Sequence, residues 1–171
     1  RVGAPLFVHG QHWHIAREGG RMVFQDETGL LDLPLPNLPG PHQIENAGAA
    51  IAALRLLGQD GTAAEAAVSQ AVWPARMQRL VRGPLREMAP GAELWLDGGH
   101  NPAAGQTIAA TLSALPDRPT YLICGMLNTK DVVGFMLPLV GMATRLYAVS
   151  IPNEQNTLSA AATTAAAQKA G

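Results

Sequence analysis

The sequence predicts an α/β protein whose second half is built around a mainly parallel sheet. Hydrophobic residues make up 47% of the 171 positions and charged residues 15%, which provides enough apolar material for a packed core. From residue 94 onward, short apolar runs alternate with single helical patterns. Strands separated by single helices are typical of βαβ units, which form parallel sheets covered by helices.

Residues 6–33 have the pattern of short β-strands. Apolar runs begin at Leu6, Trp13 and Met22, and turn-forming residues separate them. We expect a hairpin connection at residues 18–21, where two adjacent glycines suit a tight turn. The prolines of residues 34–41 exclude both a helix and a central strand, because proline fixes φ and has no N–H group.

Two helices are predicted after this proline-rich segment. Apolar residues recur at three- and four-residue steps over residues 42–57, and Gly58 provides a stop. Thr62 is predicted to cap a second helix over residues 63–72, with a glutamate three residues later as in a capping box. His42 is interpreted as a capping residue of the first helix, and Gln43 likewise.

A domain boundary is predicted at Trp73-Pro74, because the residue before a proline is disfavoured in a helix. We therefore expect one domain over residues 1–72 and a second over residues 73–171. After a turn at Gly83-Pro84, a β-rich segment should lead to Leu96. The strands predicted in the second domain are 77–81, 94–96, 121–124 and 146–149, and the helices are 102–115, 131–140 and 158 onward.

Composition excludes several classes of protein. The net charge is -1, with Lys+Arg 12 against Asp+Glu 13, so there is no basic field for non-specific nucleic-acid binding. No apolar run approaches the length of a membrane span. The single cysteine, Cys124, excludes an internal disulfide framework and fits a reducing cytoplasm. Because the chain begins at Arg1 without a methionine and ends in an Ala/Thr-rich stretch, we expect a fragment of a longer polypeptide.

The first candidate site is Asp97-Gly98-Gly99-His100-Asn101-Pro102, directly after the strand at 94–96. In open α/β sheets, ligands bind beyond the carboxyl ends of the strands, where helix N-termini also offer free N–H groups. Asp97 is suited to hold a ribose diol through two hydrogen bonds. Alternatively, Asp97 and Asn101 satisfy only turn and cap backbone groups, and the residues leave both interpretations open.

Three other polar residues are candidates. Lys130 follows the strand at 121–124, where a lysine can contact a phosphate or a carboxylate. The favoured alternative is a solvated Lys130 beside a helix cap formed by Asp131 or Thr129. Asn46 is placed near the predicted buried face of the first helix. Arg76 lies in the predicted hinge, where it either reaches nucleotide phosphates or forms an ordinary surface ion pair.

Several catalytic motifs are absent from the sequence. There is no G-x-x-x-x-G-K-[ST] phosphate loop, no G-x-G-x-x-G after a strand and no H-E-x-x-H. His9, His12 and His14 cluster at β-type spacing without a cysteine or an acidic partner nearby. A strand face is therefore favoured over a metal site, and no metal ligand is predicted.

Four segments match family motifs in the same order along the chain. They are residues 38–47 (L-x-G-x-H-Q-x-x-N-A), 73–78 (W-P-G-R-x-Q), 96–102 (L-D-G-A-H-N-P) and 125–131 (G-x-x-x-D-K-D). Together they resemble the carboxyl-terminal half of folylpolyglutamate synthase/dihydrofolate synthase, a branch of the Mur ligase family. The sequence departs from these motifs at Ala75, in place of a glycine, and at Thr129, in place of an aspartate.

The resemblance implies a domain organisation and an activity. Residues 1–72 would be the end of a central ATPase-like domain, and residues 73–171 a truncated Rossmann-like carboxyl-terminal domain. ATP would phosphorylate a carboxylate of dihydropteroate or folate, and L-glutamate would then attack the acyl phosphate to form an amide. On the matching positions, Asn46 would contact the adenine side of ATP, Arg76 its phosphates and Asp97 its ribose.

The same resemblance suggests further site residues and partners. His100 is the candidate catalytic residue, and both His100 and Lys130 are candidates for binding substrate. Mg²⁺ is implied, with its ligands in an amino-terminal part that this chain lacks, so the fragment alone is expected to be inactive. We expect a cytoplasmic monomer whose partners are ATP, L-glutamate and dihydropteroate or folate, with no nucleic acid or membrane. The alternatives are another Mur-type ligase, acting on a cell-wall precursor, and a non-catalytic nucleotide-binding module.

Overall fold

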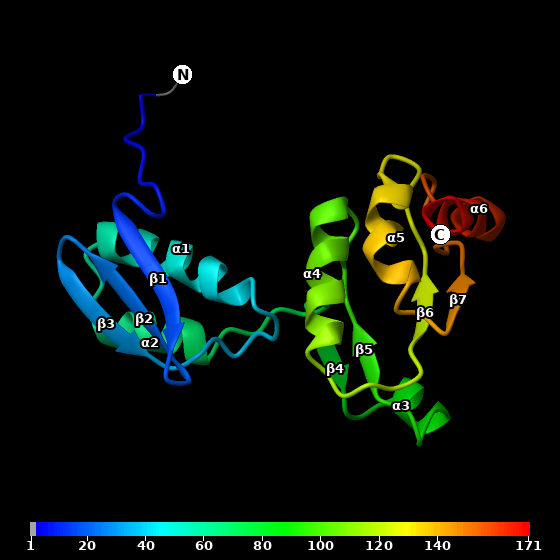
Figure 1. Ribbon diagram of the computed structural model, residues 1–171, viewed down its shortest axis with the longest axis horizontal. Helices are drawn as coiled ribbons and strands as arrows, with labels where there is room; N and C mark the ends of the chain where they lie inside the picture. The colour runs from blue at the N-terminus through cyan, green and yellow to red at the C-terminus, as the bar shows by residue number, and fades with distance from the viewer. Residues whose placement is uncertain (1–2) are drawn as a thin grey trace. The chain divides into compact units, whose positions relative to one another are not determined.

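The computed structural model describes residues 3–171, and the chain divides into two compact units (Figure 1). The first unit ends at Pro74 and the second begins at Ala75, two residues after the boundary expected from the sequence. The predicted α/β class is confirmed, whereas the assignment of the units to ligase domains stays a prediction. Within the described residues, no helix is both long and apolar enough to span a bilayer.

The first unit is built on a three-stranded antiparallel sheet with the strand order β1-β2-β3. Its strands are β1 (Trp13–Glu18), β2 (Arg21–Asp26) and β3 (Gly29–Leu33). The predicted hairpin is confirmed, since Glu18 pairs with Arg21 and the two glycines between them have positive φ. The predicted strand at residues 6–8 is wrong, because the carbonyl of Val8 accepts backbone bonds from Gln11 and His12 and so starts a turn.

Two helices follow the sheet, α1 (Gln43–Leu56) and α2 (Gly61–Ser69). The first lies within one residue of its predicted bounds, and residues 34–41 form neither helix nor strand, as expected. The second begins earlier than predicted. Asp60, not Thr62, is its N-cap, because the extended backbone of Asp60 brings its carboxylate to 3.0 Å from the N–H of Ala63.

The core of the first unit lies between α1, α2 and the sheet (Figure 1). A Cβ atom on Gly48 would lie 2.6 Å from Cζ3 of Trp13, so the absence of a side chain lets α1 approach β1 closely. Asp26 and Arg55 form a largely buried ion pair at 3.7 Å that links β2 to α1. The buried apolar residues are Trp13, Met22, Phe24, Leu33, Ala47, Ile51, Ala52, Ala64 and Val68.

The second unit alternates strands and helices, mostly as predicted. Its strands are β4 (Gln78–Leu80), β5 (Leu94–Leu96), β6 (Tyr121–Cys124) and β7 (Arg145–Ala148). Its helices are α3 (Pro84–Met88), α4 (Pro102–Ser113), α5 (Val132–Val140) and α6 (Ala160–Ala170). The segment expected to be β-rich after Gly83 begins instead with α3, because Pro84 is preorganised for the first helical position.

Strand pairing in the second unit is only partly parallel. β6 and β7 pair in parallel across α5, as the alternating pattern predicts. β5 pairs antiparallel with β4, with Gln78 opposite Leu96. The parallel arrangement is therefore confirmed for β6 and β7, whereas β5 belongs to a separate two-stranded sheet among the described residues.

Helix α5 lies between α4 and α6 and contributes more buried residues to the core of the second unit than any other element (Figure 1). A Cβ atom on Gly105 of α4 would overlap the carbonyl oxygen of Phe135 in α5. A Cβ atom on Gly134 would lie 2.8 Å from Cγ of Pro102. These close approaches place the beginning of α5 beside the beginning of α4.

Candidate functional site

The carboxylate of Asp97 joins the loop after β5 to the segment that precedes β4. Oδ2 of Asp97 accepts a hydrogen bond from the N–H of Met77 at 2.7 Å, and Oδ1 accepts one from the N–H of Gly99 at 2.7 Å. The N–H of Gly98 donates to the carbonyl of Ala75 at 2.9 Å. Asp97 therefore satisfies backbone groups, as the structural alternative predicted. Each of its oxygens also has a second lone pair for a ligand hydroxyl.

Arg76 stands between two residues in an unusual backbone conformation. Ala75 has φ 55° and Met77 has φ 42°, in the left-handed region that favours glycine. Two further features hold this segment in place. The Met77 side chain is buried, at 4% exposure, and Oε1 of Gln78 accepts a hydrogen bond from the N–H of Ala75 at 3.0 Å. Strained backbone of this kind clusters at functional sites, where surrounding contacts enforce it. The segment thus presents Arg76 from a fixed position.

Arg76, Asp97 and His100 come together at the carboxyl end of β5. Nη1 of Arg76 lies 3.8 Å from the position that a Cβ atom on Gly98 would occupy. Nδ1 of His100 lies 2.9 Å from the carbonyl oxygen of Gly98. Because a carbonyl only accepts, Nδ1 carries a hydrogen, and Nε2 of the neutral ring is then the acceptor. Both Arg76 and His100 are exposed, so a ligand has access to each.

The same cluster adjoins the N-terminus of α4. Asn101 caps this helix, with Oδ1 accepting from the N–H of Ala104 at 2.9 Å, and Pro102 occupies the first helical position, as predicted. Backbone N–H groups and the helix dipole make such a terminus favourable for an anion. The positive end of the helix and the Arg76 guanidinium therefore favour a negatively charged ligand.

Lys130 lies on the neighbouring loop, after β6. It is half-buried, and its backbone N–H donates to the carbonyl of Leu127 at 3.2 Å. Asp131 caps α5, with Oδ1 accepting from the N–H of Gly134 at 2.9 Å, which confirms the predicted cap. Because α5 begins beside α4, the loop of Lys130 lies next to the helix that follows His100.

Asn46 belongs to the first unit, whereas the other four predicted site residues belong to the second. Asn46 lies at the edge of the buried face of α1, as predicted, because it is next to the buried Ala47 and one turn from the buried Gln43, although its own side chain is exposed. Nδ2 of Asn46 donates to Oε1 of Gln43 at 3.0 Å. The expected capping roles are corrected, since His42 occupies the N-cap position without a side-chain cap bond and Gln43 is the first residue of the helix.

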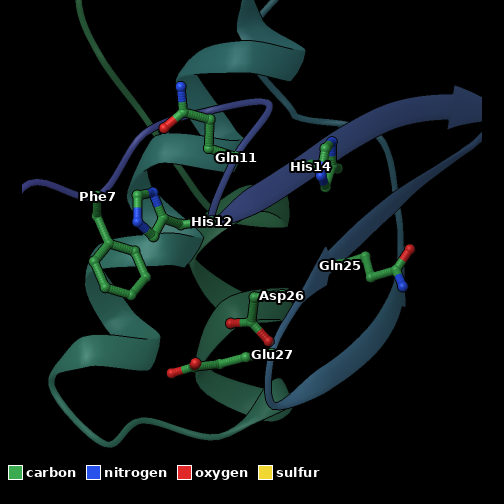
Figure 2. Close-up of a pocket in the computed structure, with 7 residues that line it drawn as sticks. All are labelled: Phe7, Gln11, His12, His14, Gln25, Asp26 and Glu27. Atoms are coloured by element: carbon green, nitrogen blue, oxygen red, sulfur yellow. The ribbon is translucent and has the colours of Figure 1, made fainter.

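An open hollow of about 440 Å³ lies in the first unit, between the segment before β1 and the end of β2 (Figure 2). Phe7 and His12 line one side of it, His14 projects from β1, and Asp26 closes the base. None of the five site residues predicted from the sequence lines this hollow. The hollow belongs to the first unit, whereas the cluster around Asp97 belongs to the second.

The histidine cluster is not a single strand face. His14 lies on β1, but His9 and His12 lie in the turn before it, and Nδ1 of His12 accepts from the N–H of Val8 at 3.0 Å. The turn forms because Val8 accepts backbone bonds instead of entering the sheet. Over residues 3–171, no group of three or more His, Cys, Asp or Glu side chains is placed to hold a metal ion.

Comparisons with known proteins give a consistent result. No family model matches the chain. A probable bifunctional folylpolyglutamate synthase/dihydropteroate synthase of Halobacterium salinarum is 33% identical over 129 residues, which cover 75% of this chain and 13% of that protein. E. coli FolC in complex with DHPP and ADP superposes with a TM-score of 0.77 and 27% identity over 94% of this chain and 36% of FolC.

A third comparison supports the fold alone. The bifunctional folylpolyglutamate synthase/dihydrofolate synthase of Yersinia pestis, complexed with AMPPNP and Mn ion, superposes with a TM-score of 0.79 at 24% identity. The match covers 96% of this chain and 37% of that structure. In each comparison, this chain spans well under half of the relative's length.

The α/β fold therefore corresponds to one part of larger synthase enzymes. Within that class, the chain is similar to the probable folylpolyglutamate synthase/dihydropteroate synthase of Halobacterium salinarum and matches the carboxyl-terminal region of E. coli FolC. The resemblance drawn from the four sequence motifs is thereby confirmed.

Proposed function

We propose that this chain is the carboxyl-terminal portion of an ATP-dependent amide ligase that adds L-glutamate to dihydropteroate or folate. The observation that carries the proposal is the likeness to FolC bound to DHPP and ADP, over 94% of this chain. The gathering of Arg76, Asp97 and His100 at one strand end supports it, because ligands of α/β sheets bind at this edge. In this proposal the second unit is the Rossmann-like domain of a Mur-type ligase.

The reaction has two steps. A carboxylate oxygen of dihydropteroate or folate attacks the γ-phosphorus of ATP, the bond from that phosphorus to ADP breaks, and an acyl phosphate forms. The amine nitrogen of L-glutamate then attacks the acyl carbon and loses a proton. Inorganic phosphate leaves with the former carboxylate oxygen, and an amide remains. Both steps depend on positioning and on neutralisation of phosphate charge.

We assign nucleotide contacts to three residues, as the family resemblance implies, and the local geometry supports the roles of Arg76 and Asp97. Arg76, held between two left-handed residues, pairs with the phosphates of ATP. Asp97 uses its remaining lone pairs to accept hydrogen bonds from the ribose hydroxyls. Asn46 contacts the adenine. The N-terminus of α4 adds N–H groups and a positive dipole beside the phosphates.

His100 and Lys130 serve the glutamate end of the reaction. With Nδ1–H donated to the carbonyl of Gly98, Nε2 of His100 is able to take the proton that the attacking amine loses. Lys130, on the adjoining loop, binds a carboxylate of glutamate or the transferred phosphate.

We propose that Mg²⁺ assists the phosphoryl transfer, and that its ligands lie in the amino-terminal part of the enzyme that the family resemblance implies. In this proposal the chain by itself is inactive. We also propose a cytoplasmic monomer whose partners are small molecules. The single cysteine fits a reducing compartment, and the net charge of -1 provides no basic field for nucleic acid.

The proposal is tested with the full-length protein that contains this chain. It is incubated with ATP, L-glutamate and either dihydropteroate, folate or a muramyl precursor, and products are identified by mass spectrometry. We expect ATP-dependent addition of glutamate to dihydropteroate or folate. Addition to the muramyl precursor alone would favour another Mur-type ligase, and binding of ATP without any product would favour a non-catalytic module.

Paired arginine variants test the assigned site. Arg76→Met should lower kcat/KM for ATP by about 100-fold, since a charge that stabilises a transition state contributes on this scale. Arg82→Met is the matched control, because Arg82 is also exposed and lies in the same unit. Equal effects of the two substitutions would contradict the role given to Arg76.

A further inference from the structure

We propose that Gln78 is a positioning residue that fixes the Arg76 guanidinium beside the loop after β5, by closing the turn that carries this arginine. The inference rests on the proposed function, in which Arg76 pairs with the phosphates of ATP. Gln78 ends the motif segment at residues 73–78, but the sequence alone gives it no role.

The side chain of Gln78 folds back across the turn. Its Oε1 accepts a hydrogen bond from the backbone N–H of Ala75 at 3.0 Å. Because a backbone N–H only donates, the oxygen of the carboxamide must face it, and the reversed amide would set two donors against each other. The bond therefore has one arrangement. It joins the residue before Arg76 to the residue two positions after it.

The β-sheet gives this side chain a fixed base. Gln78 is the first residue of β4, where it pairs with Leu96 of β5. Over residues 3–171, the bond from Ala75 is the one hydrogen bond that the Gln78 side chain makes. Removing the carboxamide therefore removes the hold on Ala75 and no other hydrogen bond.

Two peptide planes decide the conformation of Ala75. The plane after it is held because the carbonyl of Ala75 accepts from the N–H of Gly98 at 2.9 Å. The plane before it carries the N–H that Gln78 accepts. Together they hold φ of Ala75 at 55°, a left-handed value that a Cβ atom disfavours. Without Gln78 the plane before Ala75 can turn, and relief of the strain then displaces the carbonyl from Gly98.

Displacement of that carbonyl moves Arg76, which is the next residue. Nη1 of Arg76 lies 3.8 Å from the position of a Cβ atom on Gly98, so the guanidinium lies near the same glycine that holds Ala75. The exposed Arg76 side chain makes no hydrogen bond or ion pair with the part of the chain that the structure describes. Its backbone therefore places it. A group that must meet a phosphate in a set geometry loses much of its effect when it is misplaced by about 1 Å.

The test measures equilibrium binding of ATP and of adenosine to the full-length protein, so that the result does not depend on ligation. Adenosine lacks the phosphates, and the ratio of its dissociation constant to that of ATP therefore reports the phosphate contacts alone. The variants are Gln78→Met, which keeps the length of the side chain without an acceptor, Arg76→Met, and the two combined. Gln106→Met is the matched control, because Gln106 is an exposed glutamine of the same unit whose side chain makes no hydrogen bond among the described residues.

We expect Gln78→Met to lower the ratio by about 5-fold, within the coupling that neighbouring residues show. Arg76→Met should lower it by about 10- to 100-fold, as loss of hydrogen bonds to a charged group does. A residue that acts only through Arg76 has nothing to add once Arg76 is gone. Adding Gln78→Met to Arg76→Met should therefore change the ratio by less than about 2-fold, and Gln106→Met should leave it unchanged.

The outcomes separate the inference from the proposed function. An unchanged ratio in Gln78→Met, or an equal loss with and without Arg76, overturns the inference and leaves the phosphate contact of Arg76 intact. An unchanged ratio in Arg76→Met, or no binding of ATP to the unaltered protein, overturns both. A general loss of folded protein would weaken adenosine and ATP equally, which leaves the ratio unchanged and so counts against the inference.

A second measurement needs no variant. In NMR hydrogen-exchange spectra of the unaltered full-length protein, the backbone amide hydrogen of Ala75 should exchange slowly with water, because it is donated to Gln78. Exchange at the rate of an unprotected amide would mean that the turn is not closed, and this overturns the inference.

Discussion

Replacing Asp97 with asparagine removes one of the two acceptors that hold the β5 loop to the segment before β4. The carboxylate accepts from the N–H groups of Met77 and Gly99, each at 2.7 Å. Asparagine has a single oxygen, so its NH₂ group must face one of these two donors. Losing one hydrogen bond to a charged group costs about 1.5–3 kcal/mol, and the half-buried position makes the lower half of this range the expected value.

Urea unfolding, followed by circular dichroism, measures this cost on the 171-residue chain. For a small unit the free energy of unfolding falls by about 1–2 kcal/mol per molar urea, so the transition of the second unit should move down by about 1 M. Hydrogen exchange should show that the amide of Met77 or Gly99 loses protection. Asp117→Asn is the control, since Asp117 is exposed and makes no side-chain hydrogen bond or ion pair within the described residues.

Two results together would refute this reasoning. They are an unchanged urea midpoint and full protection of both amides in the Asp97→Asn protein. The sequence alone predicts such preservation of the fold, with only a raised KM for ATP, because it does not reveal the distant partner of Asp97. If the refuting result were found, the Asp97 carboxylate would be left with the ribose role alone.

Two further substitutions, one control substitution and one alkylation reaction test the packing and backbone of the second unit. Ala75→Gly should raise the free energy of unfolding by about 0.5–1 kcal/mol, because φ is 55° there; a urea midpoint that falls would contradict this. Gly105→Ala should lower it by about 1–3 kcal/mol through overlap with the carbonyl of Phe135. Gly141→Ala, with open space around it, should change it by less than about 0.5 kcal/mol, and equal effects of the two would exclude the overlap. Burial raises the pKa of the Cys124 thiol from 9.0 to about 11. Because the thiolate is the reactive form, iodoacetamide should alkylate Cys124 about 100-fold more slowly than free cysteine at pH 8, and the rate should rise as the pH approaches 11. An alkylation rate equal to that of free cysteine at pH 8 would contradict the burial of this thiol.

Local signals predicted most of the helices and strands. The four-residue strand β6 and the helix α5 fall where the apolar runs and the cap at Asp131 place them. The cap at Asn101 followed by Pro102 is also a purely local signal, and the structure confirms it. The choice between Asp60 and Thr62 as N-cap was not predictable, because both residue types are good caps and the direction of the incoming chain decides between them.

Contacts between distant residues account for what the sequence did not predict. The partner of Asp97 is the backbone of Met77, twenty residues earlier, and the antiparallel pairing of β5 with β4 brings them together. The positive φ of Ala75 is not marked by a glycine in this chain, although the motif that residues 73–78 resemble has a glycine at this position. The apolar pattern of α1 does not reveal that the polar residue Gln43 occupies the buried side of the first turn, beside the exposed Asn46.

The most direct test of the central claim follows an oxygen atom through the proposed reaction. Dihydropteroate labelled with oxygen-18 in its carboxylate is incubated with the full-length protein, ATP and L-glutamate, and the inorganic phosphate is analysed by mass spectrometry. An acyl phosphate intermediate requires that one labelled oxygen appear in the phosphate for each amide formed. Amide formation with unlabelled phosphate, or without consumption of ATP, would contradict the assignment of this chain to an ATP-dependent glutamate ligase.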